Sequence, residues 1–292
     1  MRNLIMFDFA PGKLVPGCLI FFVAMSVQAA GYSMQPIKTD PARIQDKVML
    51  SVSWESFKDL ELDEVEDFDG WTVATELVVP FMDKFQFRFN LPLRTEGDAV
   101  VKSDHWIAPG MEIDVEGNGG VFDFITLAFE HQLYREQDKG YNLSYYVGGG
   151  AVGDALETTL PRPRKGTDAI NHNGTMWMLG VKADGEHWGK QLLGNLGIRG
   201  YSRSDDLNPG NNDQMYLLDL KGAVIFDPWG RYVHPVLEFT YLGDFTDVNQ
   251  VTLLPELLIP VNPHLELKAG VAIGLGGNGS EIGGQAEASI RF

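Results

Sequence analysis

Apolar and polar residues alternate along most of this chain. In residues 85–94 every odd position is Phe or Leu, and the even positions carry Gln, Arg or Asn, with one Pro. The last eight residues, 285–292, alternate in the same way and end on Phe292. Because side chains of a strand point to opposite faces in turn, such segments have one apolar face and one polar face. The pattern therefore predicts amphipathic β-strands.

The same alternation recurs in twelve segments, which we interpret as strands. Each is close to the ~9–11 residues that a tilted strand needs to cross a bilayer. Pro235 and Pro255 fall inside two of them, although proline cannot donate to a strand ladder. Either these prolines lie at strand ends or bulges, or the predicted strand registers are shifted there. The segments are Val48–Ser56, Trp71–Val79, Phe85–Arg94, Val121–Gln132, Tyr141–Gly149, Thr175–Asp184, Gln191–Ser202, Gln214–Phe226, Tyr232–Leu242, Gln250–Ile259, Leu265–Leu275 and Gly283–Phe292.

The connections between these segments alternate between short and long. Short ones such as Phe81–Lys84 and Pro260–His264 contain turn-forming residues, whereas Thr95–Gly120 and Ala151–Gly174 are long. Outer-membrane barrels have this asymmetry between periplasmic turns and extracellular loops. The sequence thus predicts an all-β fold: a closed antiparallel transmembrane β-barrel of about twelve strands, with short periplasmic turns and longer extracellular loops.

The N-terminal region has the features of an export signal. Arg2 and Lys13 precede an apolar run, and small residues precede Ala30. We expect residues 1–29 to be a cleaved signal peptide, 30–47 a periplasmic N-terminal segment and 48–292 the barrel. The one cysteine, Cys18, lies in the part expected to be removed, so thiol catalysis is excluded from the mature chain.

Charge restricts the choice of partners. The formal net charge is −17, and such a field repels phosphate backbones, so we expect no nucleic-acid partner. The expected partners are outer-membrane lipid and lipopolysaccharide, the barrel-assembly machinery and a small solute. The expected location is the bacterial outer membrane, reached through the periplasm.

Charged residues occupy the polar face of the predicted strands. A charge that faces lipid costs about 2–4 kcal/mol at mid-bilayer, so these residues are expected to face the lumen. Their mixed signs leave two readings open: a narrow pore that selects by its lining charges, or ion pairs that plug the lumen. The lumen-lining candidates are Glu55, Glu76, Arg88, Arg94, Lys182, Arg199, Asp219, Lys221, Glu238, Glu256, Glu266, Lys268, Glu287 and Arg291.

Metal and catalytic chemistry have little support in the sequence. Asp59, Glu61 and Asp63 alternate in an acidic stretch that could hold a divalent ion, but it lacks the spacing of an EF-hand loop, and a solvated, self-repelling loop explains it better. The six histidines are scattered without metal-ligand spacing. No G-x-S-x-G motif occurs. We expect no metal site elsewhere, no cofactor, no catalytic residue and no enzymatic activity.

Two regions carry resemblances to known proteins. The segment Thr75–Pro92 has a Glu-bearing strand, a short Asp-containing turn and an alternating strand that ends in Leu-Pro. It is similar to a hairpin of the transporter-like outer-membrane family named for meta-pathway phenol degradation, and the C-terminal strand also resembles that family. The resemblance implies a barrel that passes small organic or aromatic compounds, without catalytic residues. Likeness to the final strand of bacterial barrels implies that Phe292 belongs to the assembly signal.

The leading hypothesis is therefore a passive outer-membrane channel or transporter for small solutes. The alternatives are a structural or surface-interaction barrel with a plugged lumen, and a hydrolase embedded in a barrel.

Overall fold

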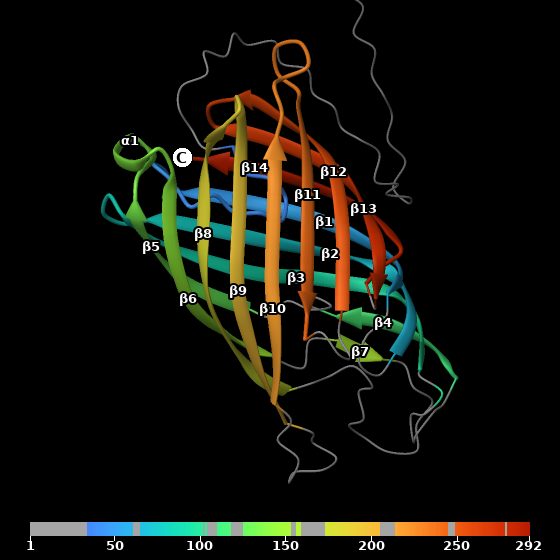
Figure 1. The fold of residues 1–292 in the computed structure, drawn as a ribbon. Helices are drawn as coiled ribbons and strands as arrows, with labels where there is room; N and C mark the ends of the chain where they lie inside the picture. Colours follow the sequence, from blue (N-terminus) through green and yellow to red (C-terminus); the bar gives the residue numbers. More distant parts are fainter. Residues whose placement is uncertain are drawn as a thin grey trace, which may run out of the picture.

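Twelve antiparallel strands close into a β-barrel (Figure 1). The structure is a computed structural model. It describes residues 34–60, 65–101, 103, 110–117, 125–152, 156–158, 173–204, 214–244, 249–277 and 279–292. The barrel strands are β1 (Met49–Leu60), β2 (Val65–Pro80), β3 (Phe85–Val101), β5 (Ile125–Tyr134), β6 (Asn142–Val152), β8 (Asn173–His187), β9 (Lys190–Ser204), β10 (Gln214–Ile225), β11 (His234–Gly243), β12 (Asn249–Asn262), β13 (Leu265–Gly277) and β14 (Ile282–Arg291).

Each barrel strand pairs with its neighbours in sequence order, and the pairing of β1 with β14 closes the ring. That last ladder runs from Met49 opposite Arg291 to Glu55 opposite Gln285. The predicted closed antiparallel barrel of about twelve strands is confirmed, and each of the twelve alternating segments overlaps one strand. No helix within the described ranges is long and apolar enough to cross a membrane.

Two short strands and one short helix lie outside this plan. β4 (Glu112–Gly117) pairs with the far half of β3, and β7 (Leu156–Thr158) pairs with β4. Both lie in stretches that the sequence assigned to long loops. β3 continues well past Arg94, and its added length gives β4 an edge to pair with. The helix α1 (Glu136–Lys139) forms one turn between β5 and β6.

The two ends of the barrel differ. At one end, called here the short-turn end, strands are joined by residues 81–84, 135–141, 188–189, 226–233 and 263–264. The C-terminus and α1 both lie at this end (Figure 1). The backbone N–H of Phe292 donates to the Val48 carbonyl over 2.9 Å, so both ends of the barrel sequence meet there. The opposite end, called the long-loop end, carries the longer connections.

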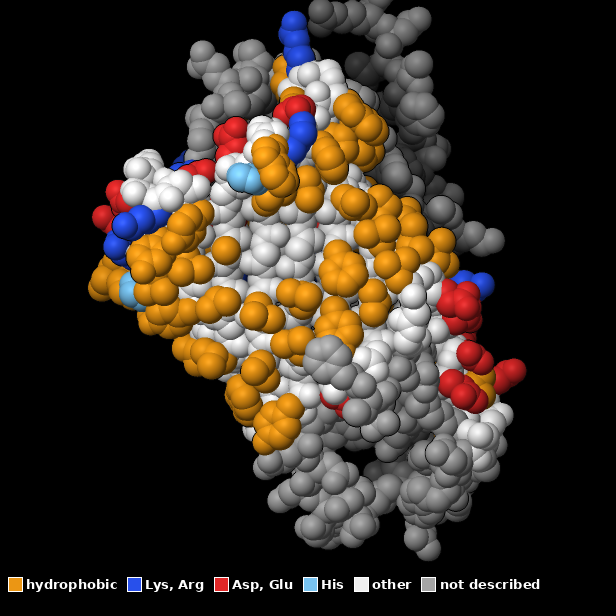
Figure 2. All heavy atoms as spheres, viewed as in Figure 1, with side chains coloured by type: hydrophobic (Ala, Val, Ile, Leu, Met, Phe, Trp, Pro, Cys, Tyr) orange, Lys and Arg blue, Asp and Glu red, His pale blue; other side chains and the backbone are white. Residues whose placement is uncertain are grey.

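The wall separates apolar from charged side chains. Large apolar residues such as Leu127, Leu179, Leu196 and Ile198 are about half exposed on the outside. Figure 2 shows such side chains spread over the wall, with charged side chains gathered towards the edges of the view. Buried polar residues, by contrast, point inward, and several of them have ionisable side chains. This division follows from the period-two alternation of the strands.

Pro235 and Pro255, the two prolines that fall inside predicted strands, occupy positions where a ladder has no pair. Pro235 is the second residue of β11, and the ladder to β10 begins only at Val236. Pro255 lies in the middle of β12, where the ladder to β13 has no pair between Leu253 and Glu256 but keeps its register. The expectation of a strand end or bulge is therefore wrong for Pro255. The missing N–H therefore interrupts pairing on one side only.

Glycines on the inner wall make room for an aromatic ring. Tyr146 on β6 lies across Gly180 on β8 and Gly197 on β9, and these glycines are cross-strand neighbours. A Cβ atom on Gly180 would lie 2.5 Å from the Tyr146 ring and 2.6 Å from the Leu196 carbonyl oxygen. The ring of Tyr146 therefore packs directly against the wall over these two glycines.

We predict that Gly180→Ala destabilises the barrel, because the added methyl group collides with both the Tyr146 ring and a backbone oxygen. Overpacking of this kind typically costs about 1–3 kcal/mol. The free energy of unfolding in urea and detergent, followed by heat-modifiable gel mobility, measures the effect. Gly222→Ala is the control, since a Cβ there meets nothing closer than 3.8 Å. Equal stability of the two variants would contradict this packing.

Candidate functional site

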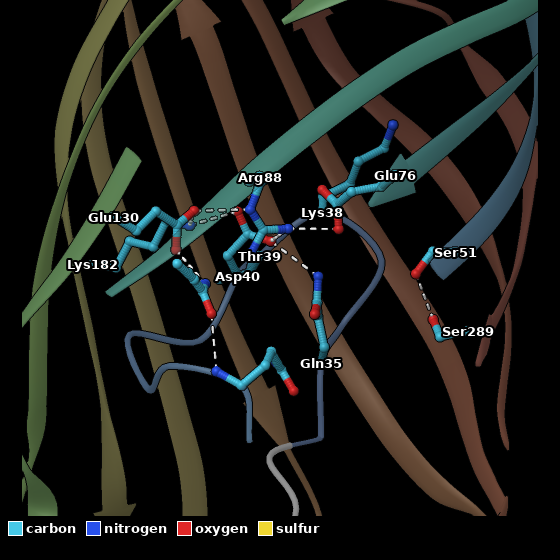
Figure 3. Close-up of polar contacts among 12 residues, drawn as sticks. Gln35, Lys38, Thr39, Asp40, Ser51, Glu76, Arg88, Glu130, Lys182 and Ser289 are labelled. Carbon is cyan, nitrogen blue, oxygen red and sulfur yellow. Dashed lines mark hydrogen bonds and ion pairs between the residues drawn. The ribbon is translucent and has the colours of Figure 1, made fainter. Parts of the chain in front are cut away.

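An N-terminal segment runs inside the barrel. Residues 34–47, called here the luminal segment, contain no helix or strand. Thr39 and Ala42 are 0% and 1% exposed, and the hydrogen bonds of the segment reach wall residues up to 219 positions away in the sequence. Figure 3 shows the segment looping between the strands. Of the predicted N-terminal segment 30–47, the described part, residues 34–47, is enclosed by the barrel wall.

Wall carboxylates accept the backbone N–H groups of this segment. Glu238 accepts from Lys38 over 3.0 Å and from Thr39 over 2.7 Å. Glu256 on the adjacent strand accepts from Ile37 over 3.2 Å. A backbone without secondary structure must find other partners when it is buried, and the side-chain oxygens of Glu238 and Glu256 supply them. The two glutamates, which are almost fully buried, thereby fix the first half of the segment.

The second half of the segment is held in the same way closer to the short-turn end. Asp184 accepts from the backbone N–H of Ala42 over 2.5 Å and of Arg43 over 3.1 Å. Its other oxygen accepts from the side-chain amide of Asn142 over 2.7 Å. The N–H of Gln45 donates to the side chain of a further wall residue, Gln86.

Asp40 joins the segment to the cations of the wall (Figure 3). One carboxylate oxygen lies 3.0 Å from Arg88 Nη1, and the other lies 3.0 Å from Lys182 Nζ. Both cations also bind Glu130, at 2.8 Å and 2.7 Å, and Arg88 binds Glu76 at 2.6 Å. Three carboxylates therefore share two cations in the interior of the barrel.

The ionisation state of Asp40 follows from two opposed effects on its pKa. Burial by itself raises the pKa of this carboxyl group, but Arg88 and Lys182 more than offset it and hold the pKa below its ordinary value. Because the pKa is lowered, Asp40 stays ionised and bound to its cations at any pH above the ordinary carboxyl range, which lies near pH ~4. These ion pairs are lost only at lower pH, as the Asp40 carboxylate becomes protonated. The ion pairs of Asp40 are thus intact at neutral and mildly acidic pH.

Further charged groups line the interior away from Asp40. Arg199 donates to Asp219 on the neighbouring strand, with its Nε atom 2.9 Å away, and Lys221 lies 3.7 Å from the same carboxylate. Lys38 of the luminal segment reaches Glu55 on β1 at 2.6 Å.

A third group is buried close to the short-turn end of β13 and β14. Lys268 lies 2.7 Å from Glu287 and 3.6 Å from Glu266, which in turn lies 3.5 Å from Arg291. These side chains are almost fully buried, so their charges are balanced by each other and not by water.

The structure places nearly all of the predicted lumen-lining residues on the inner wall. Arg94 is the exception. A register shift in the β2–β3 ladder inserts an extra residue, Leu93, so that Thr95 is fully buried and Arg94 is 53% exposed beside Glu96. The alternation that holds at Arg88 changes phase at this bulge, and the expectation for Arg94 is corrected accordingly.

Sequence reasoning missed several residues of the site. Glu130 alternates in phase with Thr126 and Ala128, so the period-two pattern could have identified it as inward-facing. Asp184, the last residue of a predicted strand, carries a similar signal. Asp40 and Lys38 lie outside the strands, and no pattern in the sequence marks them.

Cavities lie on both sides of the luminal segment. One of about 390 Å³ opens between Met34, Arg43 and the turns of the short-turn end. Two others, of about 220 and 200 Å³, lie deeper in the barrel and border Lys38. The larger of these also borders Asp40 and Arg88. The segment therefore borders one cavity at the short-turn end and two cavities deeper in the barrel.

The acidic stretch after β1 is only partly described. Asp59 has a φ of 53° and donates its N–H to Asp69 over 2.7 Å. Glu61 and Asp63, the other two candidate ligands, lie outside the described residues. Within those ranges, no group of three or more His, Cys, Asp or Glu side chains is placed to hold a metal ion.

Comparison with solved structures finds barrels of the same architecture. The COG4313 outer membrane channel from Pseudomonas putida F1 matches with a TM-score of 0.54 and 15% identity, over 89% of this chain and 100% of that one. The translocator domain of the autotransporter NalP from Neisseria meningitidis matches with a TM-score of 0.54 and 13% identity, over 84% and 88%. At these identities the likeness shows the fold. No family model matches the sequence, and no curated protein does.

We predict that Asp184→Asn loosens the luminal segment, because the amide has one acceptor oxygen where the carboxyl group has two, and both oxygens accept hydrogen bonds. Losing hydrogen bonds to a charged group costs about 1.5–3 kcal/mol, so trypsin cleavage after Arg43 should accelerate about tenfold or more. Asp227→Asn is the control, since that carboxylate is 74% exposed and contacts Lys190. Equal cleavage rates in the two variants would show that Asp184 does not hold the segment.

Proposed function

We propose that this protein is an outer-membrane β-barrel that conducts small solutes, and that the luminal segment narrows its lumen. The observation that carries the proposal is the closed wall, apolar outside and charged inside, with cavities on both sides of a segment that has no secondary structure.

The membrane location is supported by the chemistry of the outer surface. Only helices and closed barrels satisfy every backbone hydrogen bond inside a bilayer, and this chain closes its sheet completely. Its outer face exposes Val147, Leu179 and Leu196, whereas a soluble monomer rarely exposes so large a contiguous apolar surface. The similar folds include a protein named as an outer membrane channel.

Conduction is supported by the way in which the lumen is occupied. The luminal segment contributes no strand to the barrel, so its movement breaks no ladder of the wall. Cavities of about 390 and 220 Å³ border it on either side. A path through the barrel therefore needs displacement of this segment and no rearrangement of the wall. Nothing in the described residues specifically favours a hydrolase.

The remaining expectations form part of the same proposal. The resemblance of residues 75–92 to the phenol-degradation family extends the proposed solutes to small organic and aromatic compounds. Residues 1–29 would direct export to the periplasm, and Phe292 would be read by the assembly machinery. Outer-membrane lipid and lipopolysaccharide would surround the wall.

The proposal predicts that removing the luminal segment increases conductance. Single-channel currents in planar bilayers should be several-fold larger for a variant that lacks residues 34–45 than for the intact protein, because the deletion joins the cavities that border the segment. The ladders that close the wall do not involve these residues, so the variant should keep its heat-modifiable gel mobility. Correctly folded variant protein that leaves the bilayer sealed would contradict the proposed channel.

A further inference from the structure

The carboxylate of Asp40 is bound as a ligand would be. Arg88 and Lys182 approach its two oxygens from different strands, each at 3.0 Å, and the side-chain amide of Gln35 donates to it over 3.0 Å. Both cations are nearly buried, with side-chain exposures of 10% and 3%. A buried cationic pair with convergent donors is a built site for a carboxylate.

The two halves of this contact differ in how firmly they are held. Arg88 and Lys182 project from barrel strands, and Glu130 binds both of them at 2.8 and 2.7 Å. Asp40 instead comes from a segment that contributes no strand. If the segment moves, the cations therefore stay in place.

Departure of Asp40 leaves each of two buried cations with one acceptor fewer. Arg88 and Lys182 would each lose one carboxylate oxygen, and a buried charged donor that loses its acceptor is costly. The remaining wall charges balance, with Glu76 and Glu130 against the two cations. Another carboxylate would restore the arrangement seen with Asp40.

The space beside this site fits a small organic body. A cavity of about 220 Å³ borders Asp40 and both cations. Tyr146, Met176 and Met178 also line it, and the Lys182 ammonium lies 5.3 Å from the centre of the Tyr146 ring. Methionine and aromatic side chains pack well against compact apolar groups. The cavity thus offers an apolar side next to two cations.

We propose that Arg88 and Lys182 form a binding site for the carboxylate of a small organic acid, and that Asp40 occupies this site until such a solute displaces it. The proposal rests on the proposed channel for its biological role, because displacement of Asp40 detaches one anchor of the luminal segment. It narrows the solute class to carboxylates with a compact apolar body.

Calorimetric titration of the purified protein in detergent with benzoate tests the proposal. Asp40→Asn removes the competing charge and keeps the shape, so benzoate should bind about tenfold more tightly than to the unmodified protein, since apparent affinity scales with the fraction of free site. Asp46→Asn is the matched control. Asp46 lies on the same segment, is 72% exposed and pairs with Arg43, so its variant should bind as the unmodified protein does.

Two further arms define the chemistry of the site. Benzamide has the same shape without the charge, so its affinity should be the same for the Asp40→Asn variant as for the unmodified protein. Inorganic phosphate has the charge without the apolar body. If Asp40→Asn increases the affinity for phosphate as much as the affinity for benzoate, the assignment to organic acids is overturned.

A third arm removes the cations. Arg88→Gln or Lys182→Gln, added to Asp40→Asn, should abolish the gain, and heat-modifiable mobility identifies which of the two double variants folds. Benzoate affinity that is unchanged by Asp40→Asn, or that survives in a folded double variant, would overturn the proposal. The titration does not require conduction, so sealed bilayers would remove the channel and leave this binding test intact.

Discussion

The rest of this structure depends on closure of the hydrogen-bonded sheet. The ladder between β1 and β14 joins residues near the two ends of the barrel sequence and leaves the wall without an edge. Once the wall is closed, the alternation of each strand forces one set of side chains outward and the other inward. Leu196 and Ile198 therefore lie outside, and Asn195 and Arg199 lie inside. The charged interior is a consequence of the same geometry that makes the exterior apolar.

A closed interior raises the cost of every charge within it. Glu130, Glu238 and Glu266 are at most 1% exposed, so each needs partners from the protein. Wall cations supply some of these partners, and the luminal segment supplies the rest. Glu238 is bound mainly by the backbone N–H groups of Lys38 and Thr39. The segment is therefore part of the charge balance of the lumen, and its removal exposes groups that other polar molecules can bind.

Much of the wall could be predicted from the sequence, because a barrel strand carries its own signal. Twelve alternating segments became twelve strands, and the inward set followed from the same period. Arg94 could not be placed correctly, because a single inserted residue at the bulge reverses the two faces and leaves no mark in composition. β4 and β7 are too short to show a period.

The luminal segment lay beyond sequence reasoning for a different reason. Its partners are distant: Asp40 and Lys182 are 142 positions apart, and Thr39 and Glu238 are 199 apart. Residues 34–47 have no periodicity, and their burial depends on a lumen that exists only after the barrel closes. A wall residue such as Glu238 can be recognised as inward-facing, but the group that it binds cannot.

The most direct test is the accessibility of a cysteine placed at Thr39. The one natural cysteine, Cys18, lies in the expected signal peptide, so single-cysteine variants of the mature chain are unambiguous. Thr39→Cys and Trp188→Cys are reconstituted in proteoliposomes and labelled with a membrane-impermeant maleimide that is supplied on both sides of the membrane. Thr39 is 0% exposed and Trp188 is 86% exposed, so the account predicts that position 39 resists labelling while position 188 reacts rapidly. Equal labelling of the two positions would contradict a closed barrel with this segment inside it.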